Sequence, residues 1–373
     1  MGTSWQRMLN PFLQDRLLHL LVLLGAVLAL WHPLPAALLW DSLHGPTLAT
    51  LSALMVLTRG IEASGAFDHL GRHILNRLTH ERSLALFLVA AAALLSTVIT
   101  NDIALFIMVP LTLRLRTLAG LPIARLIIFE ALAVNAGSLL TPIGNPQNIL
   151  LWQVSQRSFW DFTLMMAPLA ALLNTLLLAW TAWVFPQQRI RVHLPETPSD
   201  WTPPLFFTTV LLYPLAMACV EWGHPLWGLL LASLVLGRIR RGLLFEVDWS
   251  LIAVFALMFV DIRLLTGLPL LRQWLDTLPH ASPLQVFLSA TLASQGLSNV
   301  PATMLLVPWV PAGPLLAFAV NVGGFGTAIG SLANLIALRM AKDRRIWLQF
   351  HYFSLPFLAI SVFVAGHVLL GVF

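Results

Sequence analysis

The sequence predicts an all-α polytopic membrane protein in which two inverted repeats each contribute a re-entrant hairpin and a discontinuous helix. Three observations predict this fold class. The composition is too apolar for a surface in contact with water, the basic residues are sorted between alternate loops, and a pair of motifs occurs twice in the same order.

Hydrophobic residues make up 58% of the 373 positions and charged residues only 10%, whereas a soluble domain carries about 25% charged residues. The chain therefore needs the lipid bilayer as its solvent. Its net charge of +5 comes from basic residues in short loops between apolar stretches, which is a pattern that orients a membrane protein and does not indicate nucleic acid binding. Cys219 is the single cysteine, so an intramolecular disulfide is excluded.

A membrane span needs about 20 apolar residues. Candidate full spans are 12–31, 46–66, 123–151, 161–185, 204–220, 225–238, 248–268, 312–340 and 348–371. Two more apolar stretches, 83–113 and 283–308, are interrupted in the middle by polar residues. We expect these two to enter and leave the bilayer on the same side, which gives about nine spans and two hairpins.

The basic residues orient this arrangement. If the N-terminus is cytoplasmic, 17 of the 21 Lys and Arg residues fall in cytoplasmic segments, whereas only Arg157 and Arg272 fall in outside loops. Such sorting follows the positive-inside rule. It predicts a multi-pass protein of the bacterial inner membrane, with both 67–83 and 114–125 cytoplasmic and the C-terminus periplasmic.

The internal duplication is the most specific signal. Residues 134–149 align without gaps to 320–335 with seven identities, and 96–110 align to 294–308 with five. Five predicted spans separate the starts of the two copies, and this odd number inverts the second copy. We predict one transporter domain over 1–373, composed of repeat 1 (42–185), a cytoplasmic linker (186–203) and repeat 2 (225–371). Inverted repeats with matching broken segments are typical of secondary transporters.

Residues in the duplicated motifs break the helices. Pro142 and Pro146 each remove a backbone donor, while Gly323 and Gly324 weaken the second copy through conformational freedom. Breaks free backbone carbonyls for a cation and open helix N-termini toward an anion. The candidate substrate-binding residues are Thr100, Asn101, Asp102, Asn145, Asn148, Ser298, Asn299, Thr327, Ser331 and Asn334. The alternative is ordinary helix packing, which small polar residues also mediate in membranes.

Two acidic positions stand out. A carboxylate in the middle of an apolar stretch costs at least about 2.5 kcal/mol when unpaired, so Asp102 is either a cation- or proton-coupling group or the partner of a structural contact. Glu62 lies three residues after Arg59 on one predicted helix, where the spacing predicts an ion pair.

At these motifs the sequence resembles the ion transporter superfamily, which includes divalent anion/sodium symporters, arsenite-efflux permeases, sodium/proton antiporters and citrate–metal permeases. The resemblance implies a Ser-Asn-Thr-like triplet at each hairpin tip, here Thr100-Asn101-Asp102 and Ser298-Asn299-Val300. Both depart from the pattern at the third position, so dicarboxylate specificity does not carry over. The coupling-ion residues that it implies are Ser96, Asn101, Asp102, Gly144, Ser294, Asn299 and Gly330. It also implies an elevator-type movement and, in many members, a homodimer.

The sequence therefore predicts a secondary active transporter (permease) that moves a small anion and is coupled to a sodium or proton gradient, without another cofactor. The alternatives are a sodium/proton antiporter, in which Asp102 is the exchanging group, and an arsenite or oxyanion efflux permease. A membrane enzyme is disfavoured because no nucleophile–base or metal-ligand pattern lies at the matching depth. No GxxxxGK[ST] motif indicates ATP-driven transport.

Overall fold

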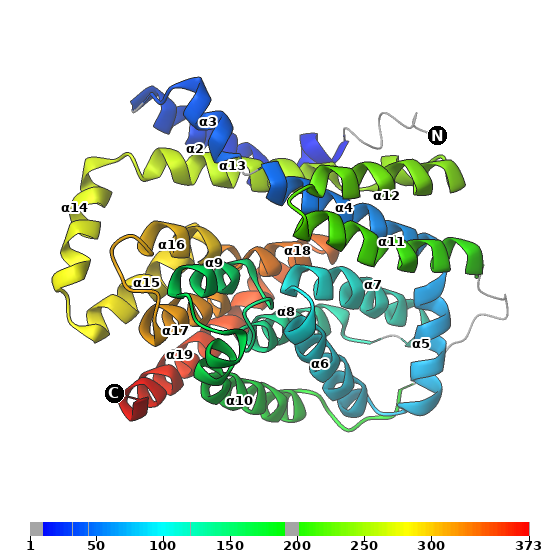
Figure 1. Cartoon of the computed structure of the whole chain (residues 1–373). Coiled ribbons are helices and arrows are strands. Elements are labelled where there is room, and N and C mark those ends of the chain that lie inside the picture. The colour runs from blue at the N-terminus through cyan, green and yellow to red at the C-terminus, as the bar shows by residue number, and fades with distance from the viewer. Residues whose placement is uncertain (1–9, 32, 44, 120, 191–200, 373) are drawn as a thin grey trace. The chain divides into compact units, whose positions relative to one another are not determined.

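The computed structural model describes residues 10–31, 33–43, 45–119, 121–190 and 201–372. Within these ranges all regular structure is helical, with one isolated β-bridge between His80 and Arg189 (Figure 1). The predicted all-α class is confirmed. The contacts cluster in two compact units, Met1–His69 with Glu196–Arg272 and Leu70–Pro195 with Gln273–Phe373. Most of the predicted linker (191–200) and the end residues 1–9 and 373 lie outside the described residues.

The first unit comprises Met1–His69 with Glu196–Arg272. Its helices are α2 (Arg16–Trp31), α3 (Ala36–Ser42), α4 (Gly45–Ala63), α11 (Pro203–Glu221), α12 (Pro225–Ile239) and α13 (Trp249–Leu265), with the 3-10 turn η1 (Leu243–Glu246). Helix α4 packs against α11 and α12, while α13 packs along α2. A Cβ atom at Gly60 would lie 2.7 Å from Thr209 Oγ1 and 2.9 Å from Leu236. The glycine therefore lets α4 approach both neighbours closely.

An ion pair lies at the end of α4, as the spacing predicted. Arg59 Nη1 lies 2.5 Å from Glu62 Oε2. The same guanidinium also pairs with Glu246 of η1, which in turn lies 3.7 Å from Arg240. The predicted Arg59–Glu62 pair is confirmed, and Glu246 extends it into a network that attaches η1 to α4.

The second unit, Leu70–Pro195 with Gln273–Phe373, contains the duplicated motifs. Its first part holds α6 (Glu81–Val98), α7 (Asn101–Ala119), α8 (Ile123–Ser138), α9 (Pro146–Ser155) and α10 (Phe159–Val184). Its second part holds η2 (Leu278–His280), α15 (Pro283–Leu297), α16 (Asn299–Leu306), α17 (Pro314–Val322), η3 (Gly323–Phe325), η4 (Ala328–Gly330), α18 (Leu332–Met340) and α19 (Ile346–Val372).

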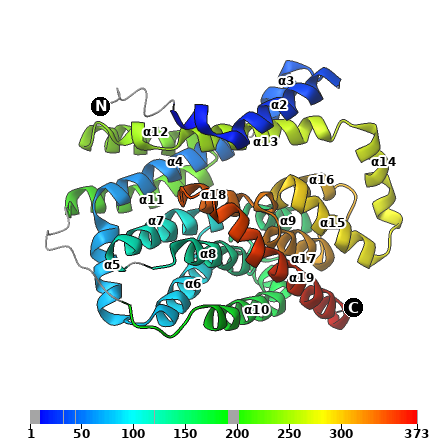
Figure 2. The same ribbon diagram turned by 180° about the vertical axis from the view of Figure 1, so that it is seen from behind.

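Helix α8 is the centre of this second unit, where α6, α7, α10, α18 and α19 all pack against it (Figure 2). Phe129 of α8 is fully buried and contacts the rings of Trp180, Phe185 and Phe353 at centroid distances of 6.0, 5.4 and 5.4 Å. A Cβ atom at Gly137 would collide with the carbonyl oxygen of Ala93. This glycine therefore fixes the close approach of α6 and α8.

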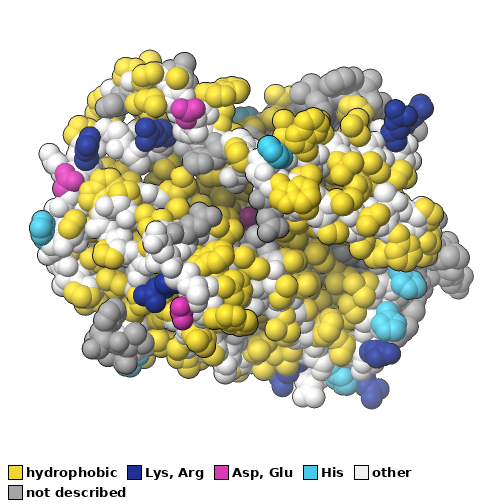
Figure 3. All heavy atoms as spheres, viewed as in Figure 1, with side chains coloured by type: hydrophobic (Ala, Val, Ile, Leu, Met, Phe, Trp, Pro, Cys, Tyr) yellow, Lys and Arg dark blue, Asp and Glu magenta, His cyan; other side chains and the backbone are white. Residues whose placement is uncertain are grey.

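Apolar side chains cover most of the face shown in Figure 3, as a chain embedded in lipid requires. Among the described residues, length and composition mark four helices as able to cross a membrane: α6, α10, α11 and α19. A bent pair, Trp249–Leu265 with Pro269–His280, would be a fifth span with a bend of 77°. Of the other predicted spans, 46–66 forms the 19-residue helix α4, which is not among these four, and the rest are shorter helices or are divided by breaks.

Three short helices lie where the sequence was expected to form loops or short connections. They are α3, α5 (Ala66–Arg77) and α14 (Pro269–Thr277). Helices α5 and α14 are short and amphipathic, and they contain charged residues such as Arg77 and Arg272. A search for long apolar stretches does not detect helices of this kind, because only one of their faces is apolar.

Candidate functional site

The first predicted hairpin and the break between α8 and α9 meet within the second unit. Helix α6 ends at Val98 and α7 begins at Asn101, so Ile99 and Thr100 form the tip. The backbone N–H of Asn101 donates to the carbonyl of Gly144, over 2.8 Å. Thr141 Oγ1 donates to the carbonyl of Thr97, over 2.7 Å. These bonds attach the tip directly to the break between α8 and α9.

The first break is closed by two asparagines. Helix α9 begins at Pro146, and Asn145 caps it by accepting the N–H of Asn148 at 2.9 Å, a strongly preferred N-cap geometry. The side-chain amide of Asn148 donates to the carbonyls of Ser138, Leu139 and Thr141 at 3.3, 3.1 and 3.0 Å. Asn148 therefore satisfies the backbone oxygens that the break leaves without helical partners.

The second hairpin is interrupted at one residue. Helix α15 ends at Leu297 and α16 begins at Asn299, so Ser298 alone forms the tip. Ser298 has φ of 74°, which is rare for a residue other than glycine and costs on the order of 1–3 kcal/mol. Backbone strain of this size concentrates at functional sites, and Ser298 belongs to the predicted substrate set.

The second break repeats the chemistry of the first. The 3-10 turns η3 and η4 replace the helix between Val322 and Ser331, and Ser331 caps α18 through its hydroxyl. The side-chain amide of Asn334 donates to the carbonyls of Gly324 and Thr327 at 2.9 and 3.2 Å. Asn334 thus holds its break as Asn148 holds the first.

Five asparagines and one serine connect the two breaks in a reciprocal network. Asn135 Nδ2 donates to Asn334 Oδ1 at 2.9 Å, and Asn321 Nδ2 donates to Asn148 Oδ1 at 2.8 Å. A second pair of bonds closes the network, because Asn145 Nδ2 donates to Asn321 Oδ1 and the Ser331 hydroxyl to Asn135 Oδ1, both at 3.0 Å. All six side chains are 4% exposed or less. Gln147, which is also buried, donates to Asn321 Oδ1 at 3.4 Å, while among the described residues its own Oε1 has no hydrogen-bond partner.

The second tip lies against this network. A Cβ atom at Gly324 would be 3.1 Å from Asn299 Nδ2 and 3.6 Å from Asn135 Oδ1. Gly324 thus leaves the space in which the amide of Asn299 approaches the second break. The corresponding position in the first copy is Ser138, whose hydroxyl accepts a hydrogen bond from Asn145 at 3.1 Å.

Asp102 is the buried acid of the site. It lies in the first turn of α7, is 5% exposed, and its backbone N–H donates to Asn101 Oδ1 at 2.9 Å. Among the described residues, its Oδ1 has no hydrogen-bond partner. The helix dipole favours a carboxylate at an N-terminus, but a buried unpartnered oxygen remains costly. Binding a proton or a cation would relieve that cost.

Most of the predicted site residues are buried in the second unit. Ser96, Asn101, Asp102, Gly144, Asn145, Asn148, Ser294, Ser298, Asn299, Gly330, Ser331 and Asn334 are buried, while Thr100 and Thr327 are partly exposed. The structure joins Asn101 to Gly144, and Asn145 and Asn148 to each other. Ser96 and Ser294 lie against Gly137 and Gly323, respectively. Whether any of them binds substrate or a coupling ion stays a prediction.

Sequence reasoning left four connecting residues out of the site. Asn135 and Asn321 complete the buried network. They are aligned, identical positions of the duplicated motif, so their identity could have marked them as candidate site residues. Thr97 and Gln295 are likewise aligned positions of the two copies. Thr97 Oγ1 donates to the carbonyl of Gly137 and Gln295 Nε2 to that of Gly323, at 3.3 and 2.6 Å.

Comparison with known proteins gives consistent results. A family model described as citrate transporter (CitMHS) matches residues 12–314. Inner membrane protein YbiR of Escherichia coli K12 is 49% identical over 371 residues, which cover 96% of this chain and 98% of that protein. An uncharacterized transporter of Methanocaldococcus jannaschii is 31% identical over 307 residues, covering 79% and 81% of the two chains. A silicon efflux transporter of rice, LSI3, is 35% identical over 165 residues, covering 43% and 34%.

Proposed function

The chain belongs to the CitMHS citrate transporter family, and from this premise we propose that it is a secondary active transporter that moves a small anion, coupled to a sodium or proton gradient. It is thus a multi-pass membrane transporter and not an enzyme. The similarity to an inner membrane protein of Escherichia coli supports a location in the bacterial inner membrane.

One observation carries the anion proposal: helices that begin at the tips pack against helices that begin at the breaks. Helix α7, from the first tip, packs against α18, from the second break. Helix α16, from the second tip, packs against α9, from the first break (Figure 1). A helix N-terminus carries a partial positive charge and free N–H groups. We place the anion among these N-termini, with Asn101, Asn299 and the polar residues of both breaks as its binding groups.

The matched hydrogen bonds support the inverted-repeat proposal, with repeat 1 over 42–185 and repeat 2 over 225–371. The bond from Asn135 to Asn334 becomes the bond from Asn321 to Asn148 when each residue is replaced by its aligned counterpart. The bond from Thr141 to Thr97 likewise becomes the bond from Thr327 to the Gln295 carbonyl, with both at 2.7 Å. Such agreement between the hydrogen bonds is expected if the two repeats face each other across an approximate two-fold axis.

The coupling ion is proposed to bind beside the anion. Sodium takes oxygen ligands. The predicted coupling-ion residues supply the hydroxyls of Ser96 and Ser294, the side-chain amide oxygens of Asn101 and Asn299, and the backbone carbonyls of Gly144 and Gly330. In the first set, the carbonyl of Gly144 already accepts the N–H of Asn101, which holds a tip and a break together. Asp102 adds the one carboxylate and would serve either a sodium ion or a proton.

Transport by purified protein in liposomes tests the proposed function. We expect uptake of citrate or a dicarboxylate from a panel that also contains arsenite and silicic acid, accelerated by either an imposed sodium gradient or an imposed pH gradient. Transport of arsenite or silicic acid alone, which are mostly uncharged near neutral pH, would instead support the efflux-permease alternative. The gradients are applied separately, and protein-free liposomes are the control. If no compound of the panel is transported but the protein exchanges sodium for protons, the anion proposal is contradicted. That result would establish the sodium/proton antiporter alternative, in which Asp102 is the exchanging group.

Cysteine labelling tests the predicted orientation and the hairpins together. In a Cys219→Ala background, cysteines introduced at Arg77 and Thr117 are both expected to react only after the cytoplasmic side is exposed, because the hairpin returns the chain to its starting side. A cysteine at Arg157, in a predicted outside loop, is the positive control for periplasmic reagent. Reaction of only one of the two test positions from outside would show that 83–113 crosses the bilayer.

A further inference from the structure

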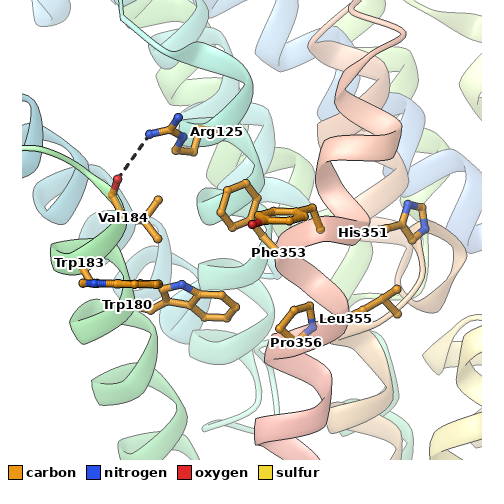
Figure 4. A pocket seen from close by; sticks show the side chains of 9 residues that line it. Arg125, Trp180, Trp183, Val184, His351, Phe353, Leu355 and Pro356 are labelled. Atoms are coloured by element: carbon orange, nitrogen blue, oxygen red, sulfur yellow. Dashed lines mark hydrogen bonds between the residues drawn. The ribbon is translucent and has the colours of Figure 1, made fainter.

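A groove on the second unit combines one cation with exposed aromatic rings, and one of its lining residues, His351, also contacts the second break. It measures about 700 Å³ and lies between α10 and α19, with Arg125 of α8 at one end (Figure 4). This volume is within the range of small-molecule sites, about 300–1,000 Å³. Because the groove opens sideways on apolar helices, its occupant has to be compatible with lipid.

The aromatic residues of the groove are unusually exposed. Trp183 is 81% exposed and Tyr352 is 76% exposed, while Trp180 and Phe353 lie deeper with their ring centroids 6.4 Å apart. Tryptophan and tyrosine are enriched where a membrane protein meets the lipid head groups. The exposed Trp183 and Tyr352 therefore predict that the groove lies at the depth where a lipid head group meets its acyl chains.

Arg125 supplies the charge. Its Nη1 donates to the carbonyl of Val184 at 3.4 Å, and its guanidinium lies 5.7 Å from the centre of the Phe185 ring (Figure 4). Glu81 is close enough for its charge to act on Arg125, but among the described residues no carboxylate forms an ion pair with it. The remaining N–H donors of the planar guanidinium group suit a phosphate, which arginine binds in a bidentate manner.

We propose that this groove binds one anionic phospholipid, with its phosphate at Arg125 and an acyl chain along Trp180, Phe353 and Pro356. Basic pockets between membrane helices on the cytoplasmic side commonly bind anionic head groups, and the segment before Arg125 is predicted to be cytoplasmic. The lipid would lie against α19, which also packs against the second break. His351 lines the groove, and its Nε2 accepts the N–H of Ala328 at 3.2 Å. Ser354 Oγ of the same helix donates to the carbonyl of Gly326 at 2.6 Å.

Native mass spectrometry of the delipidated full chain tests this proposal. Phosphatidylglycerol, phosphatidylcholine with the same acyl chains, and inorganic phosphate are titrated in parallel. We expect one tightly retained phosphatidylglycerol, weaker phosphatidylcholine and no retained inorganic phosphate. Arg125→Gln should weaken the binding of phosphatidylglycerol about fivefold, which is the contribution of one basic residue near a membrane surface.

Two further variants keep the test decisive if Arg125→Gln folds poorly. Trp183→Ala alters a mostly exposed side chain and should weaken the retention of both lipids, because it removes one wall of the groove. Arg157 is an exposed arginine near Trp152 and Trp160 but outside the groove. Arg157→Gln should therefore leave the retention of both lipids unchanged. Equal losses in Arg125→Gln and Arg157→Gln, or wild-type retention in Trp183→Ala, would overturn the proposal. Retention of inorganic phosphate at Arg125 would show an anion site instead of a lipid site.

Discussion

Replacing Asp102 by asparagine is expected to abolish the coupling of transport to its driving ion while leaving the fold intact. The two side chains are nearly isosteric, and the bond between the Asp102 backbone N–H and Asn101 Oδ1 does not involve the carboxylate. Among the described residues its Oδ1 has no partner, so the substitution removes a charge without breaking a bond at that atom. Only a role in binding a proton or cation requires the carboxylate.

The size of this effect follows from the membrane potential. One elementary charge moved across the membrane is worth about 2.3 kcal/mol per 100 mV. Loss of one coupled charge should therefore lower the concentration ratio that the protein maintains at 100 mV about 50-fold. The measurement is accumulation in liposomes held at an imposed membrane potential of about 100 mV, with the sodium and pH gradients applied separately.

A second buried acid in the same unit provides the matched control. Glu130 is fully buried in α8 and accepts a hydrogen bond from Thr112, but it lies outside the duplicated motifs. Glu130→Gln is expected to keep ion-dependent accumulation. If Asp102→Asn retained its dependence on both gradients while Glu130→Gln lost it, the coupling site would lie at α8 and Asp102 would have a structural role.

The sequence predicted the positions of the breaks because their causes are local. Pro142 and Pro146, with Gly144 between them, disfavour a continuous helix through local effects, and the structure ends α8 at Ser138 and restarts the helix at Pro146. The hairpin interruptions are also local in origin, since polar residues divide each apolar stretch. These features depend on the residues themselves, so composition and alignment of the two halves were sufficient to find them.

The partners inside the site were beyond such reasoning. The bond between Asn135 and Asn334 joins residues 199 positions apart, and no local pattern states which amide faces which. The identity of Asn135 and Asn321 between the copies marked both as special, but it did not show that they face Asn334 and Asn148. The strained backbone at Ser298 was equally invisible, because serine gives no warning of a positive φ.

The second large effect is expected from Asn148→Ala and Asn334→Ala, each of which should nearly abolish transport. Removing the Asn148 amide leaves the carbonyls of Ser138, Leu139 and Thr141 without that donor and also breaks the bond from Asn321. A buried group left unsatisfied costs about 1–3 kcal/mol. Even one such loss would shift the equilibrium between the intact and the opened break about tenfold toward the opened form, since about 1.4 kcal/mol corresponds to a factor of ten.

Asn174→Ala separates this role from ordinary helix packing. Asn174 also donates to backbone carbonyls of the second unit, those of Ala136 and Ala170, each at 2.8 Å, but it lies outside both breaks. A hydrogen bond between membrane helices contributes about 0.6 kcal/mol on average, so Asn174→Ala should transport near the wild-type rate with a slightly lower melting temperature. Because Asn148 and Asn334 hold the breaks themselves, their alanine variants should lose transport at temperatures well below their own melting. Near-wild-type rates in both would make these asparagines packing residues and would place the anion site elsewhere in the unit.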